Sequence, residues 1–421
     1  MFETKYRQRL DQDLTRWEAD GTVVPGTRAS IQSALGPMPK GVDLTTAVAI
    51  VGGLLIAAAF LAFVAANWEG IARPARFAIL VAGVVASYGL GAFFASNDRP
   101  LLADLGATVG SIVFGAAIAL TGQMYHLGED FAGGMLLWAI GALFAAIVTQ
   151  SRGALAVSLV AASIWSGGRA FDDIVPHFPF IALWLVGVAL SIIWNSPPAR
   201  HLVAVAAMAW WGTTVFGTAE FLGNGNYNPS FAYANGSAFM LGAGLMLGLS
   251  PRVEALGRTF ANYAAFGFAI ALAFAIAGAP GTQSPTVVGW EMICGALGIL
   301  GALVAAVIAK RSGHGLAAVA LVLGVLAMAV YARPNDNVEP WFSYALALAS
   351  MLAMVVSGML DDERPRVVAG WLGLAALIAI ITWTVKGSLL RRSLFLAIAG
   401  GAAIALAVLL GRWMPKVKEA A

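Results

Sequence analysis

Long apolar runs are the feature that most restricts what this chain can fold into. Runs of about 17 to 23 apolar residues recur from Leu44 almost to the end of the sequence, long enough as helices to cross a hydrocarbon core of about 30 Å. Of the 421 residues, 60% are hydrophobic and 11% are charged, whereas a soluble domain carries about 25% charged residues. The sequence therefore predicts an all-α, polytopic membrane protein.

The apolar runs give an approximate number of spans. The predicted fold is a transmembrane bundle of about fourteen helices at residues 44–413, followed by a short basic tail at 414–421. The fourteen candidate spans are 44–66, 77–95, 101–122, 131–149, 153–168, 178–194, 201–219, 234–250, 259–278, 289–309, 315–332, 341–360, 366–385 and 393–413.

The positions of the basic residues predict the orientation. With the N-terminus inside, eighteen of the 25 Lys and Arg residues fall on the inner side and seven on the outer side. Cytoplasmic loops of membrane proteins carry such an excess of positive charge. We therefore expect both termini in the cytoplasm. The same effect explains the net charge of +3, and since no basic run with interleaved aromatic residues occurs, nucleic acid is not an expected partner.

Residues 1–43 differ from the rest of the chain, because they are polar and contain no apolar run. Gly21 is a helix stop signal, and Pro25 opens a second short helical stretch. Five apolar residues recur at helical spacings of four and three, namely Phe2, Tyr6, Leu10, Leu14 and Trp17. We expect a small amphipathic helical hairpin at the cytoplasmic or interfacial side, serving either as a membrane-surface anchor or as a site for a protein partner.

Two polar stretches at the ends of spans are the candidate functional site. Both follow odd-numbered spans, so they share one face of the membrane, which is the outer face when the N-terminus is inside. Polar groups at the edge of hydrocarbon are costly unless they are paired or used. The first stretch supplies Asn67, Trp68, Arg73 and Arg76, and the second supplies Gln123, Tyr125, His126, Glu129 and Asp130.

Several interpretations of these residues remain open. His126 is a candidate proton acceptor, with Glu129 or Asp130 beside it to raise its pKa. Alternatively, Gln123, Tyr125 and His126 only cap the third span, and Asn67 and Trp68 likewise only end the first. A metal site is not predicted, because no second histidine or distant ligand accompanies this cluster. A looser polar group follows later odd-numbered spans and includes Glu220, residues 224–235, Glu291 beside Trp290, and residues 336–341.

No motif for a known chemistry occurs in the sequence. It contains no phosphate-binding P-loop, no dinucleotide-binding fingerprint, no HExxH motif and no GxSxG motif, and we expect no cofactor. Glycines at close spacing instead predict tight helix packing, namely Gly106 with Gly110, Gly244 with Gly248, and the series Gly295, Gly298 and Gly301.

The first 150 residues resemble a known family. The elements that carry the resemblance are Trp17 and Gly21, the run 65–68 (AANW), Arg73, the pair 76–77 (RF), the runs 114–118 (FGAAI) and 122–126 (GQMYH), and the pair 137–138 (LW). This order is similar to that of a bacterial family of multi-pass membrane proteins defined only as a domain of unknown function, numbered 2157. The resemblance implies a protein of the bacterial inner membrane and brings no activity, cofactor or substrate.

Three functions fit this sequence. The favoured hypothesis is a transporter or flippase-like carrier for a small or amphiphilic substrate, because the spans are numerous and carry few charges while polar groups gather at one end. The alternative is a non-catalytic sensor, assembly factor or partner subunit that uses residues 1–43. The second alternative, a membrane-embedded transferase, requires a catalytic cluster at the outer face. Membrane lipids are the expected partners in each case.

Overall fold

The computed structural model describes residues 2–35, 71–126, 130–172, 176–222, 227–278, 289–332 and 340–384, together with isolated positions between 48 and 59. All regular structure in these residues is helical. The chain divides into two compact units, Met1–Gly110 and Ser111–Ala421, and each is described by itself.

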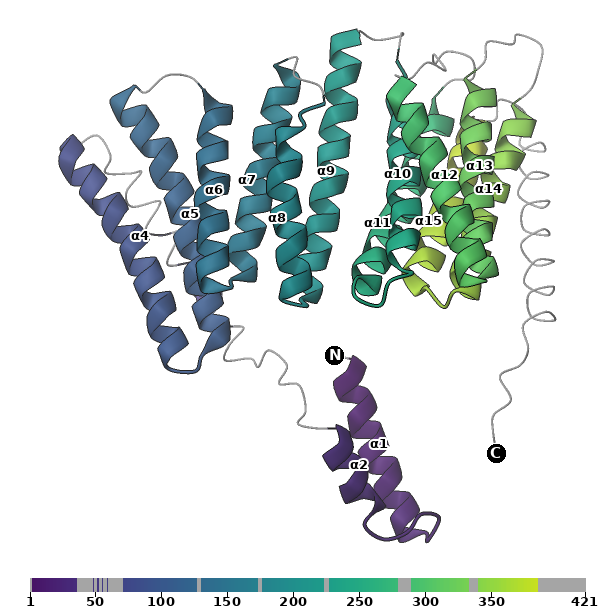
Figure 1. Cartoon of the computed structure of the whole chain (residues 1–421), viewed down its shortest axis with the longest axis horizontal. Helices are drawn as coiled ribbons and strands as arrows, with labels where there is room; N and C mark the ends of the chain where they lie inside the picture. The colour runs from purple at the N-terminus through teal and green to yellow at the C-terminus, as the bar shows by residue number, and fades with distance from the viewer. Residues whose placement is uncertain are drawn as a thin grey trace. The chain divides into compact units, whose positions relative to one another are not determined.

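The N-terminal hairpin consists of α1 (Phe2–Ala19) and α2 (Thr27–Leu35) (Figure 1). Gly21 ends α1 in the left-handed conformation, with φ of 72°. The N–H of Thr22 donates to the carbonyl of Trp17 and that of Gly21 to Glu18, which is the hydrogen-bond pattern of a Schellman motif. The predicted stop at Gly21 is therefore confirmed.

An ion pair joins the two helices of this hairpin. Arg28 of α2 donates from Nε and Nη2 to the two carboxylate oxygens of Asp11, at 2.7 and 2.9 Å. The hydrogen bond from Arg28 and its positive charge keep the pKa of Asp11 below its ordinary value. Leu14 is buried, with 3% of its surface exposed, so that one member of the predicted apolar face packs inside the hairpin.

In the same unit, α4 (Arg73–Ser96) packs against the first part of α5 (Pro100–Tyr125). The two backbones approach at Gly91 and Gly106, where a Cβ on Gly106 would lie 2.5 Å from the Gly91 Cα. Gly110, one turn further on, lies under the ring of Tyr88. The glycine pair predicted to serve helix packing does so here, because only residues without a Cβ allow this separation.

The second unit continues from α5 through ten further helices in its described residues. They are α6 (Phe131–Thr149), α7 (Arg152–Phe171), α8 (Pro179–Ile193), α9 (Pro197–Leu222), α10 (Pro229–Leu247), α11 (Glu254–Ala277), α12 (Gly289–Ala309), α13 (Ser312–Tyr331), α14 (Trp341–Leu360) and α15 (Arg364–Thr384).

Short turns join these helices in pairs at one end of the unit, which we call the short-turn end (Figure 1). It comprises residues 150–151, 194–196, 248–253, 310–311 and 361–363. Four of the five turns contain a residue in the left-handed conformation, namely Gln150, Asn195, Lys310 and Asp362. A single left-handed residue ends a helix and lets the chain reverse at once, so neighbouring helices in each pair run antiparallel. This end is the face that the charge distribution predicts to be cytoplasmic.

The main core of the second unit lies among α10–α15 (Figure 1). α10 packs against both α11 and α12, and α14 against both α13 and α15. A Cβ on Gly298 of α12 would overlap the backbone of Ala238 in α10, and Gly244 of α10 lies against Gly257 and Ala261 of α11. Small residues thus form the helix contacts, as they do where dispersion and close backbone approach drive association in a membrane.

Ten of the described helices are long and apolar enough to cross a membrane, and the predicted bundle of fourteen spans is not confirmed. Twelve of the predicted spans correspond to described helices, α4 to α15. Two of these are not among the ten: α8 has only 15 residues, and α10 carries Tyr233, Asn235 and Ser237. The predicted spans at 44–66 and 393–413, like the tail at 414–421, lie outside the described ranges.

Candidate functional site

The predicted outer-face residues are divided between the two units. Asn67, Trp68 and Glu129 lie outside the described residues. Arg73 is exposed at the first position of α4, and Arg76 donates from Nε to the Ile71 carbonyl at 2.6 Å. These arginines belong to the first unit and the Gln123–Asp130 stretch to the second, so the convergence of the two stretches stays a prediction.

Gln123, Tyr125 and His126 form the end of α5. All three are exposed, while Met124 between them is buried, with 4% of its surface exposed. His126 follows the last helical residue with φ of 52°, in the left-handed region. A residue in this conformation terminates a helix, so His126 has the backbone role that the capping interpretation assigns to it.

Asp130 joins the start of α6 to the end of α7. As the N-cap of α6 it accepts a hydrogen bond from the Gly133 N–H at 2.9 Å, and Arg169 Nη2 lies 2.9 Å from each of its two carboxylate oxygens. The Gly133 hydrogen bond is the main cause that keeps the pKa of Asp130 below its ordinary value, and Arg169 lowers that pKa further. The sequence does not mark Arg169 as the partner of Asp130, because the two residues are 39 positions apart.

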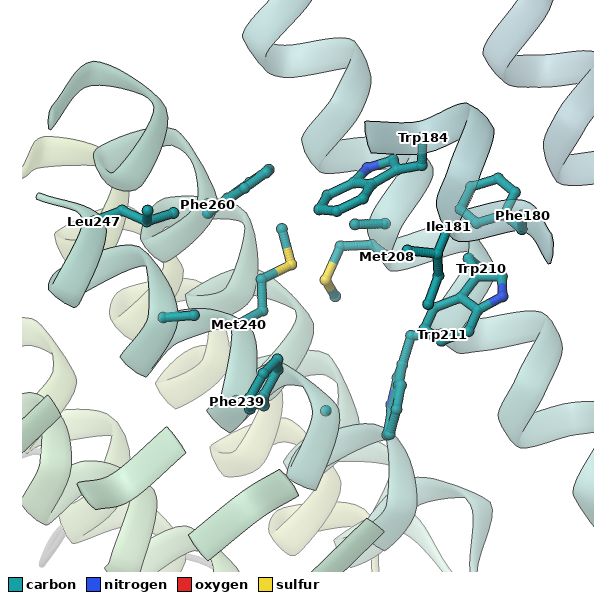
Figure 2. A pocket seen from close by; sticks show the side chains of 13 residues that line it. Phe180, Ile181, Trp184, Met208, Trp210, Trp211, Phe239, Met240, Leu247 and Phe260 are labelled. Atoms are coloured by element: carbon teal, nitrogen blue, oxygen red, sulfur yellow. The ribbon is translucent and has the colours of Figure 1, made fainter. Parts of the chain in front are cut away.

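A cavity of about 280 Å³ lies within the helices of the second unit (Figure 2). Its walls come from α8, α9, α10 and α11, and its lining surface is almost entirely apolar. Met208 of α9 and Met240 of α10 project toward each other from facing walls (Figure 2). The thirteen lining residues are Phe180, Ile181, Trp184, Ala207, Met208, Trp210, Trp211, Gly236, Phe239, Met240, Ala243, Leu247 and Phe260.

Three tryptophans of this cavity have their only polar atom engaged by the protein backbone. Trp184 Nε1 donates to the Val203 carbonyl at 2.8 Å, Trp210 Nε1 to His177 at 3.1 Å and Trp211 Nε1 to Ala232 at 3.2 Å. An indole N–H buried away from water requires a partner. Since each partner is a main-chain carbonyl, the rings present carbon surface to the cavity.

Aromatic contacts and one glycine hold these rings in place. Trp184 stacks on Phe260, and Phe180 on Trp210, each with ring centroids 6.0 Å apart. The Trp211 ring lies directly against Gly236 of α10, where any Cβ would overlap it. The walls are therefore preformed by packing between helices, as in most ligand pockets.

A buried polar pair adjoins the aromatic wall near the start of α10. Glu291, in the first turn of α12, is completely buried and accepts a hydrogen bond from the Tyr227 hydroxyl at 2.5 Å. Burial is the largest cause that raises the pKa of Tyr227, and Glu291 raises it further. Trp290 meets Trp211 edge to face with centroids 5.2 Å apart. Glu291 and Trp290 belong to the looser polar group noted in the sequence, which does not predict the contact of Glu291 with Tyr227 or that of Trp290 with Trp211.

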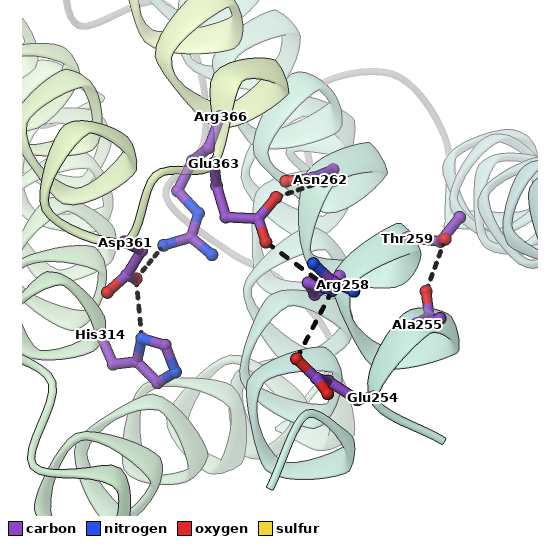
Figure 3. A network of polar contacts seen from close by, with 9 residues as sticks. All are labelled: Glu254, Ala255, Arg258, Thr259, Asn262, His314, Asp361, Glu363 and Arg366. Carbon is purple, nitrogen blue, oxygen red and sulfur yellow. Dashed lines mark hydrogen bonds and ion pairs between the residues drawn. The ribbon is translucent and has the colours of Figure 1, made fainter. Parts of the chain in front are cut away.

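A second buried network lies at the short-turn end (Figure 3). Asp361 Oδ2 accepts from Arg366 Nη1 at 2.6 Å and lies 2.7 Å from His314 Nδ1. Arg366 also donates to the Ser357 hydroxyl at 3.0 Å. Burial by itself raises the pKa of Asp361, but the hydrogen bonds from His314 and Arg366 outweigh it, so this pKa lies below its usual value. The charge-dense run at 361–366 is the signal that the sequence offers for this network, but it does not identify His314 as a partner.

Comparison with known proteins concerns only the beginning of the chain. Residues 15–155 match the family described as predicted membrane protein (DUF2157). This confirms the resemblance seen in the sequence. No curated protein and no solved structure matches the chain.

The DUF2157 match runs from within α1 into the first turn of α7. It includes Arg73, Arg76 and the Gln123–Asp130 stretch. The residues that line the apolar cavity, and both buried polar networks, follow residue 155 and lie outside the matched segment.

Proposed function

We propose that the protein binds the hydrocarbon chain of a membrane amphiphile in the cavity of α8–α11 and carries that amphiphile within a bacterial inner membrane. The observation that supports this proposal is the apolar, aromatic lining of the cavity, two of whose four helices, α9 and α11, are long and apolar enough to span a membrane. In such a setting lipid chains are the most abundant apolar ligands. A water-soluble substrate would find too few hydrogen-bond partners among these thirteen side chains.

The extent of the cavity suits a single extended chain. Its lining residues on α10 run from Gly236 to Leu247, which corresponds to about 16 Å at 1.5 Å per residue. A volume of about 280 Å³ distributed over that length makes a narrow cavity. Met208 and Met240 add flexible, polarisable side chains that adapt to irregular apolar ligands.

The polar pair beside the aromatic wall favours an amphiphile over a plain hydrocarbon. Tyr227 and Glu291 are connected to the cavity through the contact of Trp290 with Trp211. A ligand whose chain fills the cavity would bring its polar end toward one end of the helices. Transport requires the helices to shift against one another. The small residues at the helix contacts support this step because they allow such shifts.

Photo-crosslinking tests the chain-binding step. The full-length protein is reconstituted with a phospholipid that carries a diazirine in its acyl chain, and crosslinked peptides are mapped by mass spectrometry. We expect adducts on Met208, Met240 and Phe239. The variant Ala243→Trp fills the cavity and should reduce these adducts, whereas Ala189→Trp, on an exposed position of α8, should not. Adducts confined to exposed helix faces and equal in both variants would refute chain binding.

A flip assay tests the transport step separately. Proteoliposomes with a fluorescent headgroup-labelled lipid are quenched from outside with dithionite, and the protected fraction reports movement between leaflets. We expect the protein to lower that fraction and Ala243→Trp to restore it. Chain binding without movement would instead indicate a lipid-binding sensor or assembly subunit, the alternative raised by the sequence.

A protein contact through residues 1–43 remains a separate proposal. It is supported by the exposure of Trp17 and Val24, 40% and 75%, on a hairpin that its own Asp11–Arg28 pair stabilises. Deletion of residues 1–40 should abolish function while the membrane part still assembles. If the deletion has no effect on function, the hairpin serves only as a membrane-surface anchor.

A further inference from the structure

A second cavity opens at the short-turn end of the second unit, with a volume of about 460 Å³. It lies between the N-terminal parts of α9, α11 and α15, and it differs from the first cavity because ionisable side chains reach it. Seven of its ten lining residues carry charged or polar groups, namely Arg200, His201, Arg258, Thr259, Asn262, Tyr263 and Glu363.

One wall of this cavity is basic. Arg200 donates from Nη1 to the neutral Asn195 side-chain oxygen at 3.1 Å, and within the described ranges no carboxylate forms an ion pair with it. Arg258 Nε lies 3.8 Å from Glu254 and 4.0 Å from Glu363, beyond hydrogen-bond distance. His201 beside Arg200 meets Tyr263 edge to face. Arginine forks of this kind bind the oxygens of phosphate groups.

Acceptors lie beside Arg258 in the same cavity (Figure 3). Glu363 is 15% exposed, and its Oε2 accepts from Asn262 Nδ2 at 3.2 Å. Because a carboxylate only accepts, this bond fixes which end of the Asn262 amide faces Glu363. The other end, Oδ1, is buried and has no hydrogen-bond partner among the described residues. Asn262 therefore holds the Glu363 carboxylate in place, and Glu363 is the acceptor that a ligand can reach in this cavity.

The geometry points to a site for a zwitterionic headgroup that carries both a phosphate ester and a primary ammonium. We infer that the phosphate binds Arg200 and Arg258, while the ammonium donates to Glu363, whose carboxylate Asn262 positions. Basic pockets between transmembrane helices on the cytoplasmic side bind lipid headgroups, and the short-turn end is the face predicted to be cytoplasmic. A quaternary ammonium has no N–H group, so it cannot donate a hydrogen bond to Glu363.

This inference is independent of the hydrocarbon-binding proposal, because it concerns other side chains and a probe without a chain. The full-length protein in detergent is titrated calorimetrically with phosphoethanolamine, phosphocholine, glycerol 3-phosphate and inorganic phosphate. A short-chain phosphatidylethanolamine forms a further arm. We expect the two ethanolamine compounds to bind about tenfold more tightly than the others, since one charge-assisted hydrogen bond accounts for such a factor.

Variants test the phosphate-binding and the ammonium-binding residues separately. Arg200→Gln should weaken every phosphate-bearing probe, whereas Glu363→Gln and Asn262→Leu should remove the preference for ethanolamine and leave glycerol 3-phosphate unchanged. Arg252→Gln is the matched control, because Arg252 is an exposed arginine of the α10–α11 turn that does not line the cavity.

The arms also identify the source of the headgroup. Binding of phosphoethanolamine itself indicates a soluble ligand, and binding of the short-chain lipid alone indicates a lipid headgroup. The inference is overturned if no ethanolamine probe binds, if all phosphates bind equally, or if Arg200→Gln and Glu363→Gln behave like Arg252→Gln while all of them elute as folded monodisperse protein.

Discussion

Arg366 donates to Asp361 across 2.6 Å at the turn between α14 and α15, and each side chain is only 1% exposed. A buried charge that loses its partner is strongly destabilising, by about 3–5 kcal/mol. Asp361→Asn should therefore lower the thermal unfolding temperature of the purified protein markedly. Asp362→Asn is the control, because Asp362 is exposed and asparagine tolerates its left-handed φ of 57°.

A double variant distinguishes an uncompensated charge from simple loss of packing. Asp361→Asn combined with Arg366→Met removes both charges, and such replacements restore much of the lost stability. We expect the double variant to unfold at a higher temperature than Asp361→Asn alone. A double variant less stable than either single variant would show that the pair itself is net stabilising.

Acid should weaken the same turn. Because the pKa of Asp361 is lowered in the folded protein, its stabilising contribution is complete above the unfolded-state pKa of about 3.9. That contribution is lost as the pH falls through the lower folded-state value. Thermal unfolding between pH 7 and pH 3 should show a steeper decline at the acid end for the wild type than for Asp361→Asn. Parallel curves would exclude this carboxylate as the cause.

Asp130 has two separable functions in the link between α6 and α7. Asp130→Asn retains an N-cap acceptor for Gly133 and loses the ion pair with Arg169, whereas Asp130→Ala loses both. Because both partners are partly exposed, the ion pair contributes little and the cap should dominate. We expect unfolding temperatures in the order wild type, Asn, Ala, with the larger step between Asn and Ala. A larger first step would assign the main role to Arg169.

Gly236 is the position where one added methyl group should displace the Trp211 ring from the wall of the apolar cavity. Gly236→Ala would push its Cβ into the Trp211 ring, and overpacking of this kind costs about 1–3 kcal/mol. Gly212→Ala is a matched control on α9, since its Cβ would make an ordinary 3.5 Å contact with Tyr233. Acyl-chain crosslinking should fall in the first variant and persist in the second. Equal crosslinking in the two variants would show that the ligand does not contact the Trp211 ring.

The helices could be predicted from the sequence, because spanning a membrane imposes an apolar length on each of them. The predicted spans 131–149 and 289–309 coincide with α6 and α12. The structural functions of two glycines could also be predicted, since Gly21 ends α1 and Gly298 brings α10 and α12 together. Both signals are local, and each acts through the backbone of the residue itself.

Lateral contacts could not be predicted in the same way. Every helix that lines the apolar cavity is apolar on several faces, so nothing in the sequence marks Met208 and Met240 as neighbours. The pairs Asp130–Arg169 and His314–Asp361 join residues 39 and 47 positions apart. Which residues become partners depends on how the turns bring distant helices side by side. The predicted outer site rests on polar residues clustered within each stretch and on the order of the spans, whereas the buried polar groups have their partners on other helices.

The backbone bonds of Trp184, Trp210 and Trp211 limit what the apolar cavity can recognise. With each indole N–H committed to a main-chain carbonyl, these rings distinguish ligands only by shape. Chain length, branching and unsaturation should then change affinity in this cavity, while exchange of one headgroup for another should leave its contribution constant. Discrimination between lipid classes would have to arise at the helix ends, where charged and hydrogen-bonding side chains are available.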